Sequence, residues 1–537
     1  MTQSSSVSIP WQELSEALDG DFSTENTILL QHSEDASIFQ VKPLAVAFPK
    51  NKNDIKTALT FCRNHKIPVF PWGAGTSRGG QALGKGLILN FQKHMNKILD
   101  FDKRKGLLTV EPGAYYSDVQ KYLQQQGRSF PPDPSYHQCT IGGMVANNAA
   151  GIRSVKYGAT IQHVESMQYL TVDGEEHRSD KESSIQKRIH NLLQDSWTEI
   201  QKDFPKVEKN SAGYNLNLCY ENGPTGELPN LTKLLVGSEG TLGIITEVKL
   251  HTVPLQAHST LLIAYFKTLA AALEASLVLR NYNIAACELV DKVLLDLHGE
   301  SSMKALSYGS QNGPKHAKKI EKNSYLDRFY ELESEAVLLI EFEADTKESC
   351  SALAWEASKA LIEGRHLAQY INEVTEPEEV KLAWDLRRHS SPILNKLEDG
   401  KISIKPLWAV EDVSLPRENF LAYVEEQQKI FIKNKLVCSF FGHAASANLH
   451  IDPVSIDPRV ALQDKEVAAL YKKVAEESYD LVIHFGGSIS GEHGDGLLRT
   501  PYLRKQYPVS YLIFQEVKNI FDPLNLLNPG KIVEYSL

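Results

Sequence analysis

The sequence predicts an α+β protein of two or three domains, and three observations lead to this fold class. The chain has 537 residues, too many for one ordinary hydrophobic core. Up to Pro254, short apolar strands alternate with stretches that are dense in glycine and other turn residues. After Pro254 the pattern changes to strand, helix, strand, which is typical of an open sheet with helices on one face.

The first expected elements belong to an N-terminal segment and a first domain. Residues 1–40 are predicted to form a helical segment, and residues 41–255 a domain of short strands and loops. Leu44–Phe48 and Val69–Pro71 are apolar runs of strand length, and a helical pattern covers Asp54–His65 between them. The second strand leads directly into a glycine-rich loop.

A second domain is predicted over residues 256–500, followed by a C-terminal segment over residues 501–537 that becomes helical. The polar, lysine-rich stretch Gly299–Asn323 is interpreted as a solvated insertion. The strands and helices expected in the second domain are Leu261–Tyr265, Thr268–Arg280, Ala285–Val290, Val337–Phe342 and Lys347–Leu361.

Composition narrows the classes of protein. The chain carries 57 Lys and Arg against 67 Asp and Glu, a net charge of −10, and no long basic run, which argues against a nucleic-acid partner. Its six cysteines lack CxxC spacing, so no zinc ribbon or iron–sulfur cluster is predicted. No apolar run reaches the roughly 18 residues of a transmembrane segment, and Met1–Leu14 lacks a signal pattern. We expect a cytoplasmic protein, and the sequence leaves peripheral docking at the inner membrane open.

A glycine-rich loop, Gly73-Ala74-Gly75-Thr76-Ser77, follows the strand that ends at Pro71. Because glycine has no Cβ, such a loop lets backbone N–H groups converge on an anion. The spacing is not the dinucleotide GxGxxG, and no Gly-Lys-Ser/Thr follows as in a P-loop. Alone, this loop is explained equally well as an ordinary tight turn.

Two further loops in the same domain strengthen the case for a ligand. Pro131–Ser135 leads into Thr140–Gly151, and Gly237–Glu247 follows later; both stretches are rich in small residues with hydroxyl and amide groups. Three such loops in one domain suit a long diphosphate ligand that is held by backbone atoms. Taken singly, each loop has an alternative explanation as a turn between strands.

In this order, the three loops resemble the FAD domain of the vanillyl-alcohol-oxidase/p-cresol-methylhydroxylase superfamily, over about residues 42–254. The resemblance implies a two-part FAD-binding domain of the p-cresol-methylhydroxylase type and an α+β substrate (cap) domain. It also implies a C-terminal helical segment that returns to the flavin and packs on the FAD domain. The FAD contacts that it implies are Pro71, Gly73, Ala74, Gly75, Thr76, Ser77, Pro134, Ser135, Thr140, Ile141, Gly142, Gly143, Asn147, Gly151, Glu239, Gly243, Ile245 and Asn528.

The resemblance also bears on how FAD is attached. Some members of the superfamily attach flavin covalently through His or Cys, and His137 and Cys139 lie near one of the flavin loops. The D-2-hydroxyacid dehydrogenase branch, which motifs of the C-terminal half described below resemble, binds FAD non-covalently. Non-covalent FAD is therefore the expectation, with covalent attachment as the alternative.

Histidines and a glutamate form two motifs in the C-terminal half, His443-x6-His450 and Glu492-His493 between glycines. Imidazoles and a carboxylate are good ligands for Zn²⁺ or another borderline divalent ion, and three protein ligands leave a position open for substrate. A spacing of seven places two side chains on opposite faces of one straight strand, so a common site needs a turn over Ala444–Ala447. Hydrogen-bonded loop histidines are the alternative.

These motifs resemble the D-2-hydroxyacid dehydrogenase branch, which includes D-lactate, D-2-hydroxyglutarate and glycolate enzymes. The resemblance implies that His443, His450 and Glu492 are ligands of a divalent metal, with Zn²⁺ preferred, and that His493 is the catalytic base. Many relatives have a Gly-Asp-Gly-rich turn between the histidines and an Asn two residues beyond the second one. This chain has Ala445-Ser446-Ala447 and then Asp452, so the usual motif gives no expectation for substrate size.

Two cations are candidates for binding a substrate carboxylate. Trp384-x-x-Arg387 lies in an expected helix and resembles the family's Trp-x-x-Arg, and the planar guanidinium suits a carboxylate. Lys405 is the second candidate. The alternative for Arg387 is a solvated charge on the helix surface.

Together these features predict FAD-dependent, metal-assisted oxidation of a small D-2-hydroxy acid of the D-lactate or D-2-hydroxyglutarate type to the 2-oxo acid. The electrons are expected to pass to a separate acceptor, which is an electron-transfer protein, an iron–sulfur subunit or a quinone. A flavin oxidase that uses O₂ and a flavin-binding subunit of a larger redox complex are the alternatives. The sequence leaves the particular hydroxy acid, the acceptor and the oligomeric state open.

Overall fold

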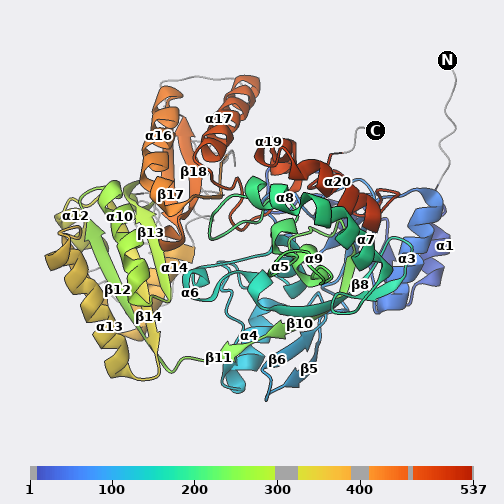
Figure 1. The fold of residues 1–537 in the computed structure, drawn as a ribbon, viewed down its shortest axis with the longest axis horizontal. Coiled ribbons are helices and arrows are strands. Elements are labelled where there is room, and N and C mark those ends of the chain that lie inside the picture. Colours follow the sequence, from blue (N-terminus) through green and yellow to red (C-terminus); the bar gives the residue numbers. More distant parts are fainter. Residues whose placement is uncertain (1–8, 297–324, 389–409, 457–463, 535–537) are drawn as a thin grey trace, which may run out of the picture.

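Three sheets organise the chain in the computed structural model, which describes residues 9–296, 325–388, 410–456 and 464–534. Figure 1 shows two of these sheets, with their helices, in the blue-to-green part of the chain. The third runs from the light-green to the orange part, and the red C-terminal helices lie back against the first part. The predicted solvated insertion Gly299–Asn323 falls outside the described residues.

The first sheet is small and has the order β1-β2-β4-β3. Its strands β2, β4 and β3 are parallel, and β1 adds antiparallel to β2. Asn51 caps the N-terminus of helix α3 by accepting from two backbone N–H groups, so this helix begins two residues before the predicted one. The elements are α1 Trp11–Ala17, β1 Asp21–Ser23, α2 Asn26–Gln31, β2 Ala45–Phe48, α3 Lys52–His65, β3 Val69–Trp72 and β4 Leu87–Asn90.

The N-terminal segment differs from the prediction of a helical segment over residues 1–40. Its two helices, α1 and α2, are separated by strand β1, whose Phe22 pairs with Ala47 of β2. Pairing with a strand more than twenty residues away is not visible in local periodicity, which explains why the sequence alone suggested helix.

The second sheet is antiparallel, with the order β5-β6-β10-β8-β9. Strands β7 and β11 form a separate two-stranded antiparallel pair in the same part of the chain. Helices of this part of the chain lie against the sheet (Figure 1). The elements are β5 Ile98–Asp102, β6 Leu107–Val110, α4 Tyr116–Gln125, β7 Arg128–Ser129, α5 Ile141–Asn147, α6 Ser154–Tyr157, β8 Val164–Leu170, β9 Glu176–Arg178, α7 Ser184–Leu193, α8 Trp197–Asp203, α9 Leu231–Leu235, β10 Ile244–His251 and β11 Val253–Pro254.

The third sheet has seven strands, in the order β15-β12-β14-β13-β17-β18-β16. All of its pairings are antiparallel. The elements of this part are β12 His258–Phe266, α10 Leu269–Leu279, β13 Ala286–Asp291, α12 Tyr325–Glu331, β14 Ala336–Ala344, α13 Lys347–Lys359, β15 Tyr370–Val374, α14 Pro377–Arg388, β16 Val413–Ser414, α16 Phe420–Lys433, β17 Leu436–Gly442, β18 Asn448–Ile456 and α17 Asp464–His484.

Helices cover both faces of this third sheet, whereas the sequence suggested one face. Along β12, Leu262 and Ala264 join the core formed with α10, α13 and α16, and the alternate residues Leu261 and Ile263 pack with Trp384 of α14. Because successive strand residues point to opposite faces, a strand that is apolar at nearly every position requires cover on both sides. The second cover, α14, carries one of the candidate functional residues.

The C-terminal segment returns to the first sheet. It contains α18 Gly496–Arg499, α19 Leu503–Gln506 and α20 Ser510–Phe521, and α20 lies beside α7. Beyond α20, the Val69 N–H donates to Leu526 O over 2.7 Å and the Asn528 N–H donates to Val69 O over 2.8 Å. The chain end is thereby joined to β3, which precedes the glycine-rich loop. Within the described ranges, every helix is too short or too polar to cross a membrane.

Candidate active site

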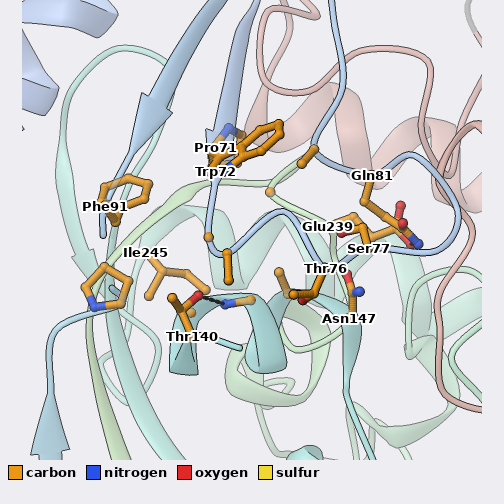
Figure 2. Close-up of a pocket in the computed structure, with 18 of the residues that line it drawn as sticks. Pro71, Trp72, Thr76, Ser77, Gln81, Phe91, Thr140, Asn147, Glu239 and Ile245 are labelled. Carbon is orange, nitrogen blue, oxygen red and sulfur yellow. Dashed lines mark hydrogen bonds between the residues drawn. The ribbon is translucent and has the colours of Figure 1, made fainter. Parts of the chain in front are cut away.

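A groove lies where the three small-residue loops of the first part meet, and it encloses about 760 Å³, counting the space open to solvent. Figure 2 shows Thr140 and Ile245 at one end of this groove and Gln81 and Glu239 at the other. Its walls come from the loop after β3, the start of α5 and the loop before β10. The sequence-predicted residues that line it are Pro71, Gly73, Ala74, Gly75, Thr76, Ser77, Thr140, Gly142, Gly143, Asn147, Glu239, Gly243 and Ile245.

Glycines make this groove possible because the loops approach each other closely. A Cβ on Gly73 would lie 2.5 Å from Thr140 Oγ1, and a Cβ on Gly142 would lie 2.7 Å from Pro112 Cβ. Real Cβ atoms do not come so near other heavy atoms. The loops therefore present backbone atoms and small side chains, as a long ligand held by backbone requires.

The remaining predicted FAD contacts lie elsewhere. Pro134 and Ser135 line the neighbouring chamber, and Ile141 and Gly151 line neither space. Asn528 lies behind the groove, where its Nδ2 donates to Gln81 O and Glu239 O. The residues of the groove that are not among the predicted FAD contacts are Trp72, Gln81, Ala82, Phe91, Pro112, Ala146 and Gly240.

Glu239 is a buried carboxylate in the wall of the groove. It accepts from the backbone N–H groups of Asp495 and Gly496, and its φ of 53° is in the left-handed region. Burial raises its pKa to about 7, although these N–H groups act in the opposite direction. Through Glu239, the loop after Glu492-His493 is fixed against the groove.

A larger chamber of about 1,660 Å³, again counting open space, adjoins the groove. Groove and chamber share five wall residues, which are Ala74, Gly75, Thr76, Gly143 and Asn147. Three arginines and three residues of the His and Glu motifs also line the chamber, namely Arg78, Arg387, Arg388, His450, Glu492 and His493. The groove and the side chains of the His and Glu motifs therefore line two adjoining spaces that share a wall.

Three candidate metal ligands converge at the edge of this chamber. Glu492 Oε1 lies 3.0 Å from His443 Nε2 and 3.3 Å from His450 Nε2. Tetrahedral ligands at the usual Zn²⁺ distances lie about 3.3 Å apart, which is close to these two distances. All three donor atoms lie within 4.8 Å of one another. His443 itself lies behind the chamber wall and is 3% exposed.

The fold explains how the two histidines meet. β17 ends at Gly442, the residues Ala444–Ser446 form one 3-10 turn, and Ala447 takes a left-handed conformation with φ 49°. The chain then reverses into β18, and the centroids of the two imidazole rings lie 5.3 Å apart. The turn that the spacing of seven required is thus present.

Both histidines have their other ring nitrogen occupied. His443 Nδ1 lies 2.6 Å from Glu288 Oε1, and His450 Nδ1 lies 3.2 Å from the backbone oxygen of Glu411. Such partners fix the ring orientation and leave Nε2 for a metal. Burial lowers the pKa of His450 to about 4, which keeps its imidazole neutral, as a ligand must be.

Lys209 also contacts one of the three candidate metal ligands, Glu492. Its Nζ lies 3.2 Å from Glu492 Oε2 and 3.1 Å from Asn448 Oδ1. The two oxygens of Glu492 are therefore divided, with Oε1 toward the histidines and Oε2 toward the lysine.

His493 stacks on His450, with ring centroids 5.0 Å apart and planes at 16°. Its Nδ1 contacts Glu411 at 2.6 Å, and its Nε2 lies 3.7 Å from Glu492 Oε1. Glu411, His450 and His493 are close enough to form a second, overlapping donor set. A cation lies beside the carboxylate of each set, Arg499 at 3.1 Å from Glu411 and Lys209 at 3.2 Å from Glu492. We favour the first set because it unites the residues that the sequence motifs predict as ligands.

The loop that carries Glu492 and His493 is held by one buried carboxylate. Asp412 Oδ2 accepts from the backbone N–H groups of both residues over 2.8 Å, and Oδ1 accepts from Asn448 Nδ2. A Cβ on Gly491 would lie 2.3 Å from Asn448 Nδ2, so only glycine fits at that point of the loop.

Arg387 is buried rather than solvated, with 3% of its surface exposed. Its Nε donates to Glu288 Oε2 over 2.7 Å, and its guanidinium lies 5.3 Å from the Phe441 ring. Its Nη2 has no hydrogen-bond partner among the described residues. A buried donor without a partner in a chamber wall is suited to an anionic ligand. Lys405, the other predicted cation, lies outside the described residues.

The residues that sequence reasoning missed are the buried partners of the motif residues, namely Lys209, Glu288, Glu411, Asp412 and Arg499. No local motif marks them. A signal was nevertheless present, because Glu288 interrupts the apolar run Ala285–Val290 and Glu411-Asp412 interrupts Val410–Leu415. Acids in strands of this kind are buried only when they are paired.

The two residues considered for covalent attachment differ in position. His137 contacts Asp133 Oδ1 at 2.8 Å and lines a third cavity, away from the groove. Cys139 lines the chamber, and burial raises the pKa of its thiol to about 12, which leaves little of the nucleophilic thiolate near neutral pH.

Comparison with known proteins finds a matching protein family for each of the two parts of the chain. Residues 43–180 match the family described as "FAD binding domain", and residues 255–532 match "FAD linked oxidases, C-terminal domain". The second match alone covers more than half of the chain.

Individual relatives match along nearly the whole chain. D-2-hydroxyglutarate dehydrogenase of Haemophilus influenzae is 28% identical, over 96% of this chain and 50% of the relative. The chain thus spans about half the length of that protein. Glycolate oxidase subunit GlcD of Bacillus subtilis is 29% identical, over 95% of this chain and 94% of its own.

Among solved structures, p-cresol methylhydroxylase with substrate bound aligns with a TM-score of 0.67 at 17% identity, over 97% of this chain and 95% of the other. A likeness at this identity shows a shared fold. The two-part architecture predicted from the sequence is confirmed by it.

Proposed function

The chain belongs to the family of FAD-linked oxidases, and from that premise we propose that it oxidises a D-2-hydroxy acid of the D-lactate or D-2-hydroxyglutarate type to the 2-oxo acid. The observation that carries this proposal is that two sites adjoin. The groove shares five wall residues with the chamber that Arg387, Glu492 and His493 line. A cofactor that accepts hydride and groups that bind a carboxylate and a hydroxyl would thus face one substrate.

The groove fits FAD, since its walls are glycine-rich loops where backbone atoms approach closely. Gly73 to Ser77 and Thr140 to Gly143 would hold the diphosphate, and Glu239 and Ile245 would lie along the rest of the cofactor. FAD, when bound, supplies the hydride acceptor for the hydrogen on C2 of the substrate. With the His137 and Cys139 positions described above, we propose non-covalent binding.

His443, His450 and Glu492 fit a divalent metal, for which we propose Zn²⁺, because they offer two nitrogens and one oxygen at compatible spacing. A bound metal supplies Lewis acidity that lowers the pKa of the substrate hydroxyl. Lys209 and Glu288 hold these ligands in place from outside the donor set.

Arg387 is the proposed anchor for the substrate carboxylate. Its Nε is engaged by Glu288, and its buried Nη2, without a partner among the described residues, is left for the carboxylate. Fixing the carboxylate orients C2 in the chamber, so that the C2–H bond can face the groove. Lys405 remains a second proposed cation on the basis of the family resemblance.

His493 is the proposed base. Glu411 engages its Nδ1, which leaves Nε2 to accept the hydroxyl proton as the C2–H bond breaks. The C–O bond becomes a carbonyl as two electrons leave with the hydride and one proton goes to the imidazole. The substrate thus loses the two hydrogens that separate a 2-hydroxy acid from a 2-oxo acid.

Reoxidation of the flavin requires an electron acceptor, and we propose a separate one, namely an electron-transfer protein, an iron–sulfur subunit or a quinone. A cytoplasmic location, with contact at the inner membrane when the acceptor is a quinone, accords with this role. A flavin oxidase that uses O₂, or a flavin-binding subunit of a larger complex, is the second candidate. The name of the Bacillus relative, which is called a subunit, favours the latter.

A dye-linked assay tests the proposal. Purified protein, loaded with FAD, is offered a panel of 2-hydroxy acids in both enantiomers with an artificial electron acceptor. We expect reduction of the dye with at least one D-2-hydroxy acid and far less with its L-enantiomer. Rapid turnover with O₂ alone would favour the oxidase, and no turnover with any member of the panel would favour the flavin-binding subunit.

A further inference from the structure

We propose that Glu288 is a positioning residue that joins the metal ligand His443 to the carboxylate-binding Arg387 and sets the spacing of the two substrate anchors. This inference rests on the proposed function and deepens it. A 2-hydroxy acid carries its hydroxyl and its carboxylate on neighbouring carbons. A site that grips both groups must keep its two anchors at a fixed separation.

The geometry assigns one oxygen of Glu288 to each anchor. Oε1 lies 2.6 Å from His443 Nδ1, and Oε2 accepts from Arg387 Nε over 2.7 Å. Glu288 is 0% exposed, so bulk solvent does not reach this carboxylate. These two contacts are the ones that the described structure gives its side chain, and each partner is a proposed functional group.

Strand pairing places Glu288 beside the histidine. β13 pairs with β17 in a register that sets Leu289 opposite Gly442. The position before Leu289 therefore lies across from the position after Gly442, which is His443. The hydrogen bond between the two side chains follows directly from this register.

Helix packing places Glu288 beside the arginine. Glu288 shares a face of β13 with Ala286 and Val290, because residues two apart in a strand point the same way. Those two residues pack with Trp384 of α14, and Arg387 lies one helical turn further along. Three elements that are distant in sequence thus meet at one carboxylate.

The bond pattern determines what each anchor can do. A carboxylate accepts only, so Glu288 takes the Nδ1 proton of His443, and a metal bound at this site would replace the proton on Nε2 that faces Glu492. Arg387, held by Nε, keeps its Nη groups for a ligand. Loss of one Glu288 oxygen would free one anchor to rotate and leave the other anchor with half of its restraint.

The matched test compares Glu288→Gln with Asp291→Asn in the full-length, FAD-loaded protein. Asp291 is also a buried acid on β13, but its partners are Ser439 Oγ and the backbone N–H groups of Phe440 and Leu294. Zn²⁺ affinity is measured by competition with a chromophoric chelator. KM and kcat are measured with the best substrate of the panel at saturating Zn²⁺.

For Glu288→Gln we expect Zn²⁺ affinity to fall about 10- to 100-fold, the range found for partners of metal-bound histidines. We also expect KM at saturating Zn²⁺ to rise at least tenfold, since Arg387 loses its orientation. FAD content should stay at the wild-type level. Asp291→Asn should leave both the Zn²⁺ affinity and the KM within threefold of wild type.

Two results would overturn the inference. A Glu288→Gln protein that loses only thermal stability would make this residue a structural ion pair. A fall in Zn²⁺ affinity without a rise in KM would remove the link to Arg387. If Glu288→Gln does not fold, Glu288→Asp keeps the charge but shortens its reach, and the same two readouts apply.

Failure of the proposed function can be distinguished from failure of the inference about Glu288. If wild-type protein oxidises none of the hydroxy acids, that proposal falls, and the inference is then tested by Zn²⁺ affinity and by oxalate binding, followed through the flavin absorbance. Weaker binding of both probes to Glu288→Gln would keep the Glu288 link. Binding of either probe equal to wild type would overturn it.

Discussion

The groove proposed for FAD and the cluster around Glu492 are adjacent but are constructed in different ways. The groove is made of backbone and small side chains, and its shape depends on glycines at Gly73 and Gly142 that allow loops to touch. The cluster is made of charged side chains that are almost fully buried, each with a partner of opposite charge or a histidine. One site is defined by space and the other by electrostatic pairing.

This difference determines how each site tolerates change. Taking an ion out of water costs several kcal/mol even in a relaxed protein. Removing one member of a buried pair therefore leaves the other member as a buried charge whose desolvation cost is no longer offset. Adding a methyl group to a packed loop costs about 1–3 kcal/mol, because neighbours must shift. We therefore expect larger and more specific losses from changes in the cluster than from changes in the groove.

The largest effect is expected from His493→Ala, at the centre of the cluster. Loss of a positioned base costs on the order of 10²–10⁴ in rate, and we expect that loss in flavin reduction by the substrate, measured by stopped flow. FAD and metal should be retained, because the side chain lies outside the favoured donor set. Metal loss in proportion to lost activity would instead identify His493 as a ligand.

Arg387→Ala should come next. Truncating a buried, charge-assisted contact costs about 2–5 kcal/mol, and we expect that cost in kcat/KM for the hydroxy acid. Part of it arises because Glu288 would keep a buried charge facing only His443. Lys381→Ala, on an exposed face of the same helix, is the control and should leave the kinetics unchanged. Wild-type kinetics in Arg387→Ala would mean that the arginine only stabilises the fold.

In the groove, Gly142→Ala should weaken FAD binding by about 1–3 kcal/mol, since the new Cβ meets the backbone and ring of Pro112. FAD affinity is measured by reconstitution of the apoprotein. Gly364→Ala is a control with an open position, where the nearest atom lies 3.9 Å away. A Gly142→Ala protein that binds FAD as tightly as wild type would show that the loops adjust to the added methyl group.

The same contrast explains how much the sequence could predict. The residues proposed for the cofactor and the metal belong to local motifs that the sequence displays. Strands such as β12 and β13 follow from apolar runs, and their positions are predicted within a few residues. Glu288 and Glu411 could not be assigned to His443 and His493, because their meeting depends on the β13–β17 register and on long-range packing. Strand β1 was missed for the same reason, since its partner lies far along the chain.

The smallest effect is expected at the turn between the two ligand histidines, in Ala447→Gly. Ala447 has a left-handed backbone, which costs a residue with a Cβ roughly 1–2 kcal/mol that glycine would avoid. Glycine brings its own costs, about 0.4–1 kcal/mol from the more flexible unfolded chain and about 0.8 kcal/mol from the buried methyl group that is lost. These terms nearly cancel, so the free energy of unfolding should change by less than about 1 kcal/mol, as measured by thermal unfolding. Gly442→Ala, at the other end of the turn, has no such balance. Its φ is 123°, and its Cβ would lie 2.9 Å from the His450 ring, so both stability and metal retention should fall. Equal behaviour of the two variants would show that this hairpin is shaped by the ligand histidines rather than by its backbone.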